Sequence, residues 1–104
     1  MDAVVCYNDQ IALEIIYELE ALGISIPDDI SVTGYDNSAL ARLGVIKLTT
    51  IAHPQKKLGE MAGQLLLEQI QGIPNEKSKV TRVIEPELIV RNSCKDRRRM
   101  EEKR

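Results

Sequence analysis

The stretch VVCYNDQIALEIIYELEALG, from Val4 to Gly23, predicts a strand, a polar corner and a helix in direct succession. Residues Ala3 to Tyr7 form a continuous apolar run of strand length, which is typical of a parallel-sheet strand buried on both faces. From Gln10 to Leu22, apolar residues recur every three or four positions, as they do along the buried face of a helix. Gly23 then supplies the residue type with which helices often end.

A second strand and polar corner follow in ISVTGYDNS, from Ile30 to Ser38, after the loop sequence ISIPDD. A strand, a helix and another strand this close in the chain predict a right-handed βαβ unit with parallel strands. The predicted fold class is therefore α/β, a parallel sheet with flanking helices.

The second half of the chain predicts shorter elements, most of them bounded by proline or glycine. They are a helical turn at Asn37 to Leu43, an extended segment at Ile46 to Pro54, a helix from Pro54 to about Gln71, a loop or hairpin at Gly72 to Lys79, and two extended halves at Arg82 to Ser93. Pro54 suits the start of a helix because its missing N–H has no partner there. Pro86 separates the last two halves and favours an edge strand or a bend.

Composition points to one small, soluble globular domain, and it gives little support for binding to nucleic acid. The 104 residues are 43% hydrophobic and 29% charged, with three Tyr and no Phe or Trp. The core must therefore be aliphatic, and few rings are left to stack on bases or sugars. The net charge of −2 gives no general reason to bind nucleic acid. We expect residues 94–104 to be a charged, disordered tail, with a nucleic-acid contact through Arg97 to Arg99 as the alternative.

No apolar run approaches the length of a membrane span, and no signal segment opens the chain, so we expect no membrane partner. Cys6 lies within an apolar run and is expected to be a small buried hydrophobe. Cys94 is far from it in sequence. We predict free thiols in a reducing cytoplasmic setting, with a disulfide as the open alternative.

The sequence contains none of the common motifs for catalysis, metal binding or cofactor binding. His53 is the single histidine, and neither a close cysteine pair nor a phosphate-binding glycine loop is present. No serine lies in a nucleophile elbow, and neither cysteine has an obvious base. We therefore predict a binding protein that is not an enzyme and has no metal and no cofactor.

The polar corners at residues 7–9 and 35–37 are the candidates for a binding site, because ligands of α/β sheets lie beyond the carboxyl ends of the strands. Two interpretations are open for the first corner. Asn8 or Asp9 can cap the helix, or can contact a ligand, and one residue can do both. His53 is either an ordinary packed residue or a third ligand contact.

Four motifs in this order resemble the effector-binding domain of the lactose/galactose-repressor family. They are YNDQIAL at Tyr7 to Leu13, IPDDISVTGYDNS at Ile26 to Ser38, LTTIAHPQKKLGEMA at Leu48 to Ala62, and EPELIVRNS at Glu85 to Ser93. The CYND and HP sequences resemble the arabinose repressors of Gram-positive bacteria within that family. The resemblance implies a fold like the periplasmic sugar-binding proteins, in which two α/β lobes close on a ligand.

Residue by residue, the resemblance implies that Asn8, Asp36 and His53 contact a small sugar effector, while Asp9 starts the helix. It implies a homodimer contact along the helix Gln10 to Leu22. The residues proposed for that contact are Ile11, Leu13 and Ile15. It also places the segment Pro54 to Gln71 in the other lobe.

Residues 1–93 are thus expected to be the carboxy-terminal portion of a sugar-effector-binding domain. The intact protein would be a transcriptional repressor that releases DNA when it binds the sugar, with L-arabinose implied. It would contact DNA only through an amino-terminal domain that this chain lacks. Two alternatives remain open: part of a sugar-binding transport protein, and a stand-alone dimerising α/β module.

Overall fold

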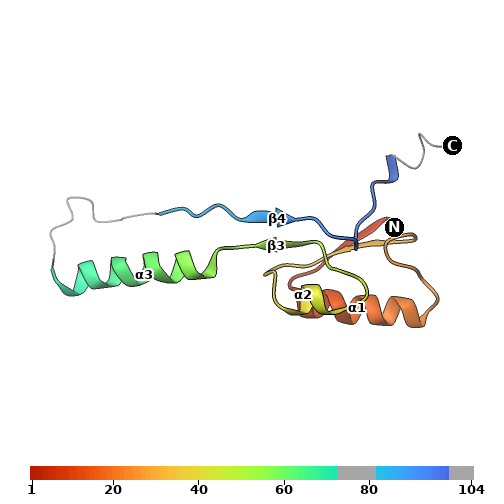
Figure 1. The fold of residues 1–104 in the computed structure, drawn as a ribbon, viewed down its shortest axis with the longest axis horizontal. Helices are drawn as coiled ribbons and strands as arrows, with labels where there is room; N and C mark the ends of the chain where they lie inside the picture. The colour runs from red at the N-terminus through yellow and green to blue at the C-terminus, as the bar shows by residue number, and fades with distance from the viewer. Residues whose placement is uncertain (73–81, 99–104) are drawn as a thin grey trace. The chain divides into compact units, whose positions relative to one another are not determined.

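The computed structural model describes residues 1–72 and 82–98, and it divides the chain into two compact units rather than one (Figure 1). The first unit comprises Met1–Ala52 and Glu87–Arg104, and the second comprises His53–Pro86. The helix after Pro54 thus falls in the second unit, and its place in another lobe of a larger domain remains a prediction. The predicted loop at Gly72 to Lys79 lies, apart from its first residue, outside the described residues.

The first unit begins with the predicted βαβ arrangement. Strand β1 (Ala3–Val5) leads into helix α1 (Asp9–Ala21), and strand β2 (Ser31–Thr33) follows. The two strands are parallel, with Val4 opposite Val32. The predicted α/β class and the parallel pairing are therefore confirmed, although both strands are shorter than expected.

Strand β1 is not buried on both faces, so that expectation is wrong. Successive side chains of a strand point to opposite faces. Val4 packs against the core, whereas Val5 on the opposite face is 83% exposed. The described helices of this unit cover the Val4 face, which explains why one face alone is shielded.

Helix α1 ends as its sequence predicts. Gly23 has a φ of +82°, a conformation that glycine adopts without steric cost. The Gly23 N–H donates to the Glu20 carbonyl at 3.0 Å, and the Ile24 N–H donates to the Leu19 carbonyl at 2.9 Å. These two bonds form a Schellman motif, which satisfies carbonyls at the helix end.

Three further elements complete the first unit. They are helix α2 (Leu40–Leu43), strand β3 (Thr50–Ala52) and strand β4 (Glu87–Ile89). Strands β3 and β4 pair antiparallel, and a parallel bridge between Thr33 and Thr49 joins β2 to the segment before β3. The predicted helical turn and third extended segment are thus present in shorter form. Of the two extended halves around Pro86, only the second forms a strand within the described residues.

The core of the first unit is aliphatic apart from one thiol, as the composition predicted. Its buried residues are Cys6, Ala12, Ile16, Ile26, Val32, Ala41 and Leu48. They come from α1, α2, β2 and the segments beside them, so the core packs α1 against the parallel strands. Cys6 and Cys94 are both free thiols, as expected.

The second unit contains helix α3 (Gln55–Ile70), which begins one residue after Pro54. The Pro54 carbonyl accepts a hydrogen bond from the Leu58 N–H at 2.9 Å, so proline occupies the position just before the helix. No residue of α3 is buried, and its apolar residues Leu66 and Ile70 are more than half exposed. None of the helices in the described ranges has the length and apolar character needed to cross a membrane.

The start of the predicted tail is bonded to the loop before β2. The Lys95 ammonium forms an ion pair of 2.9 Å with Asp28, and Arg97 donates to the Asp28 and Pro27 carbonyls. The hydrogen bond and charge of Lys95 lower the pKa of the Asp28 carboxyl. Residues 94–98 are therefore attached to the first unit, unlike a frayed segment. The remainder of the expected tail lies beyond the described residues.

Candidate functional site

The two polar corners lie side by side in the first unit. Because β1 and β2 are parallel, their carboxyl ends meet at the same edge of the sheet. The Asp9 N–H donates to the Tyr35 carbonyl at 3.0 Å, which joins the two corners directly. The structure therefore brings Asn8 and Asp36 to one edge, as the sequence predicted.

Asn8 caps helix α1. Its backbone is extended, with φ −152° and ψ 175°, and its Oδ1 accepts a hydrogen bond from the Ile11 N–H at 2.8 Å. This contact satisfies one of the N–H groups that a helix start leaves without a partner. The Asn8 amide nitrogen carries two further donors. It makes no hydrogen bond to any described residue, so capping leaves these donors available to a ligand.

Asp9 begins α1, as expected, but its carboxylate does not cap the helix; that role belongs to Asn8. Asp9 is only 1% exposed. Its Oδ1 accepts from the Thr50 hydroxyl at 2.6 Å, and its Oδ2 accepts from the N–H and hydroxyl of Ser38 at 2.6 and 3.0 Å. A buried carboxylate needs such donors to remain satisfied. Asp9 therefore ties together the helix start, the second corner and strand β3.

Gly34 is required by the position of Asp9. A Cβ at Gly34 would collide with the Asp9 carboxylate and would lie 2.7 Å from the Leu48 side chain. The glycine in the sequence GYD thus leaves room for the Asp9 Oδ1 atom, which accepts the hydrogen bond from Thr50.

The second corner has an unusual backbone at the residue proposed to bind the ligand. Asp36 has a φ of +105° and Asn37 a φ of +53°. Two consecutive non-glycine residues with positive φ are rare, and such outliers gather at functional sites. The Asn37 side chain accepts a hydrogen bond of 2.7 Å from the Arg91 guanidinium.

His53 belongs to the second unit, where it precedes Pro54 and α3. It is half-buried. The sequence placed it with Asn8 and Asp36 by resemblance, and its part in a common site remains a prediction.

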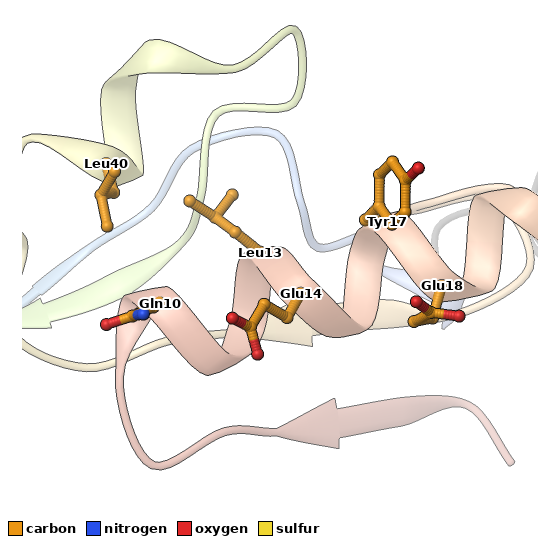
Figure 2. Close-up of a pocket in the computed structure, with 6 residues that line it drawn as sticks. All are labelled: Gln10, Leu13, Glu14, Tyr17, Glu18 and Leu40. Carbon is orange, nitrogen blue, oxygen red and sulfur yellow. The ribbon is translucent and has the colours of Figure 1, made fainter.

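The residues proposed for the dimer contact lie on two sides of α1. Each helical residue turns by about 100°, so Ile11 and Ile15 are close together and Leu13 lies about 160° from both. Leu13 lines an open groove of about 480 Å³ with Tyr17 and Leu40, flanked by polar residues (Figure 2). Leu13 and Ile15 both also pack against the core, and Ile11 is exposed.

Two features limit the chemistry of this unit. Burial raises the pKa of the Cys6 thiol, which favours an unreactive neutral form. Across residues 1–72 and 82–98, no group of three His, Cys, Asp or Glu residues could hold a metal ion.

Sequence reasoning missed the polar network behind the corner, which consists of Ser38, Thr50 and Arg91 around Asp9 and Asn37. These partners are 13 to 54 positions apart in the chain, so no local pattern connects them. The one local signal in the sequence was Gly34, because a glycine beside an acidic corner can indicate that another group packs closely against the backbone.

Comparisons with known proteins find relatives over most of the chain. The family model described as periplasmic binding protein-like domain matches residues 1–94. The arabinose metabolism transcriptional repressor of Geobacillus stearothermophilus is 41% identical over 95 residues, which cover 90% of this chain and 26% of the repressor. The transcriptional repressor PurR of Vibrio campbellii is 45% identical and matches 89% of this chain and 27% of its own length. The chain thus spans about a quarter of these relatives.

Solved structures of transcriptional regulators share the fold. A LacI-type regulator from Bifidobacterium animalis subsp. lactis has a TM-score of 0.81 at 34% identity, over 90% of this chain and 33% of that one. A LacI family regulator from Enterococcus faecium with bound ribose has a TM-score of 0.76 at 37% identity, over 88% and 34%. The complex of the regulator CelR with cellobiose has a TM-score of 0.79 at 32% identity, over 89% and 28%.

Proposed function

Because the chain belongs to the family of periplasmic binding protein-like domains, we propose that it forms part of the effector-binding domain of a LacI-type transcriptional repressor. The curated relatives that support this proposal are transcriptional repressors. The chain would bind a ligand and not convert it, so the proposal assigns no reaction.

The proposed effector is a small sugar. The observation that carries this proposal is the meeting of Asn8 and Asp36 at one edge of the sheet, joined by the hydrogen bond from Asp9 to Tyr35. The Asn8 amide can donate to a hydroxyl oxygen, and the Asp36 carboxylate can accept from a hydroxyl proton. This pairing of a donor and a charged acceptor suits the vicinal hydroxyls of a sugar.

Three sugars are the first to test. Ribose and cellobiose are bound in two solved relatives, and arabinose appears in the name of a curated one. L-arabinose agrees with the CYND and HP sequences noted above. His53 is proposed as a third contact, and the resemblance alone supports it.

The proposed mechanism is a population shift. A ligand favours one state of the protein only by binding it more tightly than the other state. Sugar bound at Asn8 and Asp36 would favour the closed form of the domain, and a separate DNA-binding domain would then release DNA. This mechanism places the intact protein in the cytoplasm, where DNA is accessible.

A homodimer contact on α1 completes the proposal. The groove of Leu13, Tyr17 and Leu40 offers apolar side chains on one side of the helix (Figure 2). We centre the contact on Leu13, because Ile11 and Ile15, the other two residues proposed from the sequence, lie on the other side of the helix.

Calorimetric titration of the full-length protein tests the function directly. L-arabinose, D-ribose and cellobiose are titrated separately, and DNA binding is measured with and without each sugar. The proposal expects that at least one sugar binds and lowers the affinity for DNA. A protein that binds DNA with equal affinity in the presence of all three sugars, and releases no heat with any, contradicts it.

A further inference from the structure

The Asp36 corner, defined as residues 35–38, has a backbone that its own sequence disfavours. Asn is among the residues that tolerate a left-handed conformation, and Asn37 at +53° lies within that region. Asp36 at +105° lies outside it. A residue of this kind is energetically unfavourable and persists only when its surroundings hold it.

The two ends of the corner are fixed by the β3 segment and by α1. The Asp36 N–H donates to the Ile51 carbonyl at 2.9 Å. Two residues later, the Ser38 N–H and hydroxyl both donate to the same Asp9 oxygen. The corner is therefore anchored to strand β3 on one side and to the first residue of α1 on the other.

The middle of the corner is held by Arg91. One guanidinium nitrogen of Arg91 donates to the Asn37 side chain at 2.7 Å, and another donates to the Leu48 carbonyl at 2.9 Å. The Asn37 N–H donates to the Thr50 hydroxyl at 3.3 Å. Because Arg91 has a planar, forked set of donors, it fixes the direction of the Asn37 side chain as well as its distance.

We propose that Asp9 and Arg91 are positioning residues that hold the Asp36 corner in its ligand-binding conformation. The proposal rests on the proposed function, since it assumes that Asp36 contacts the effector. Neither residue is required to touch the sugar. Asp9 and Arg91 would instead keep Asp36 in place before the ligand arrives. Binding then does not have to order the corner, and the affinity is higher for that reason.

Two variants separate positioning from a general structural role. Arg91→Lys retains the positive charge but loses the forked donors, and Asn37→Gly removes the side chain that Arg91 holds. Glycine also accepts positive φ readily, so Asn37→Gly relieves strain while it releases the corner. Arg98→Lys is the matched control, because the Arg98 side chain is 91% exposed and pairs only with Asp96 among the described residues.

Affinity is measured by calorimetry in the full-length protein with the sugar that the wild type binds most tightly. We expect each variant to weaken binding about tenfold, with little change in Tm, and the control to bind as the wild type does. The double variant should lose no more than either single variant, because both remove the same contact. Unchanged affinity in Arg91→Lys and Asn37→Gly, with or without a lower Tm, overturns the proposal.

Amide hydrogen exchange gives a second readout that needs no sugar. We expect faster exchange at the Asn37 and Ser38 amides in Arg91→Lys and in Asn37→Gly, and unchanged exchange in β2. Asp9→Asn, which weakens the acceptor of the Ser38 N–H, should speed exchange at the Ser38 amide as well. If the wild type binds none of the sugars, the proposed function fails, and exchange then decides the positioning claim by itself. Wild-type exchange rates at both amides in both variants overturn it.

Discussion

The Asp9 carboxylate accepts a hydrogen bond of 2.6 Å from the hydroxyl of Thr50, which lies 41 positions further along the chain. Both residues are almost fully buried. This bond joins the first turn of α1 to the first residue of β3. Because Asp9 also accepts from Ser38 of the second corner, the bond connects both corners of the candidate site to β3.

Replacement of Thr50 by valine should destabilise the first unit. Valine keeps the branched shape but cannot donate, so a buried oxygen of Asp9 loses its partner. We expect the free energy of unfolding to fall by about 1–3 kcal/mol, as measured by urea denaturation. The matched control is Thr33→Val, because the Thr33 side chain makes no hydrogen bond to a described residue. Equal losses in the two variants would contradict the role assigned to the Thr50 hydroxyl.

Replacement of Ser93 by alanine should also be costly. The Ser93 hydroxyl donates to the Val32 carbonyl at 2.6 Å and accepts from the Thr49 N–H at 2.8 Å. Ser93 is fully buried, so both backbone groups would lose a partner where water cannot replace it. Chemical denaturation should show a loss of about 1–3 kcal/mol. Ser25→Ala is the control, because Ser25 is exposed. A Ser93→Ala protein as stable as this control would refute the role of the two Ser93 hydrogen bonds.

Local sequence patterns predicted the elements that depend on local forces. The α1 helix, its end at Gly23 and the parallel pairing of its flanking strands follow from periodicity, glycine and chain length. The burial of β1 on both faces was predicted wrongly. That feature depends on what covers the Val5 face, and residues near Val5 in the sequence carry no information about it.

The candidate site was predicted only in outline. The corners at Asn8 and Asp36 were recognisable because each follows a strand, and parallel strands end at one edge. The sequence did not show that Asn8 caps the helix while the Asp9 side chain is buried. An asparagine and an aspartate can both cap a helix, and only the distant donors Ser38 and Thr50 determine which of them is buried.

The two cysteines should differ sharply in reactivity. Cys6 is buried and its pKa is raised by that burial, whereas Cys94 is partly exposed. At neutral pH, iodoacetamide should label Cys94 first and Cys6 only after unfolding, which mass spectrometry of peptides can follow. Labelling in denaturant is the control for intrinsic reactivity. Labelling of Cys6 as fast as Cys94 in the native protein would show that the β1–α1 connection is open.

A charge in the α1 groove should disrupt the proposed homodimer. Leu13→Glu places a carboxylate beside Tyr17 and Leu40, where burial against a second copy would be unfavourable. Sedimentation velocity should show a shift from dimer to monomer, while the circular dichroism spectrum remains unchanged. Ile11→Glu, on the other side of the helix, should have the smaller effect. A Leu13→Glu protein that remains dimeric would exclude this groove as the centre of the contact.

The central claim is that the Asp36 corner binds a sugar effector, and calorimetry of an Asp36→Ala variant of the full-length protein tests it most directly. The sugar is the one of L-arabinose, D-ribose and cellobiose that binds the wild type most tightly. Loss of a charged acceptor should weaken binding at least about tenfold, or about 1.4 kcal/mol. Glu87→Ala, an exposed acidic residue in β4, is the control and should leave the affinity unchanged. An Asp36→Ala protein that folds and binds the sugar with wild-type affinity would contradict the claim.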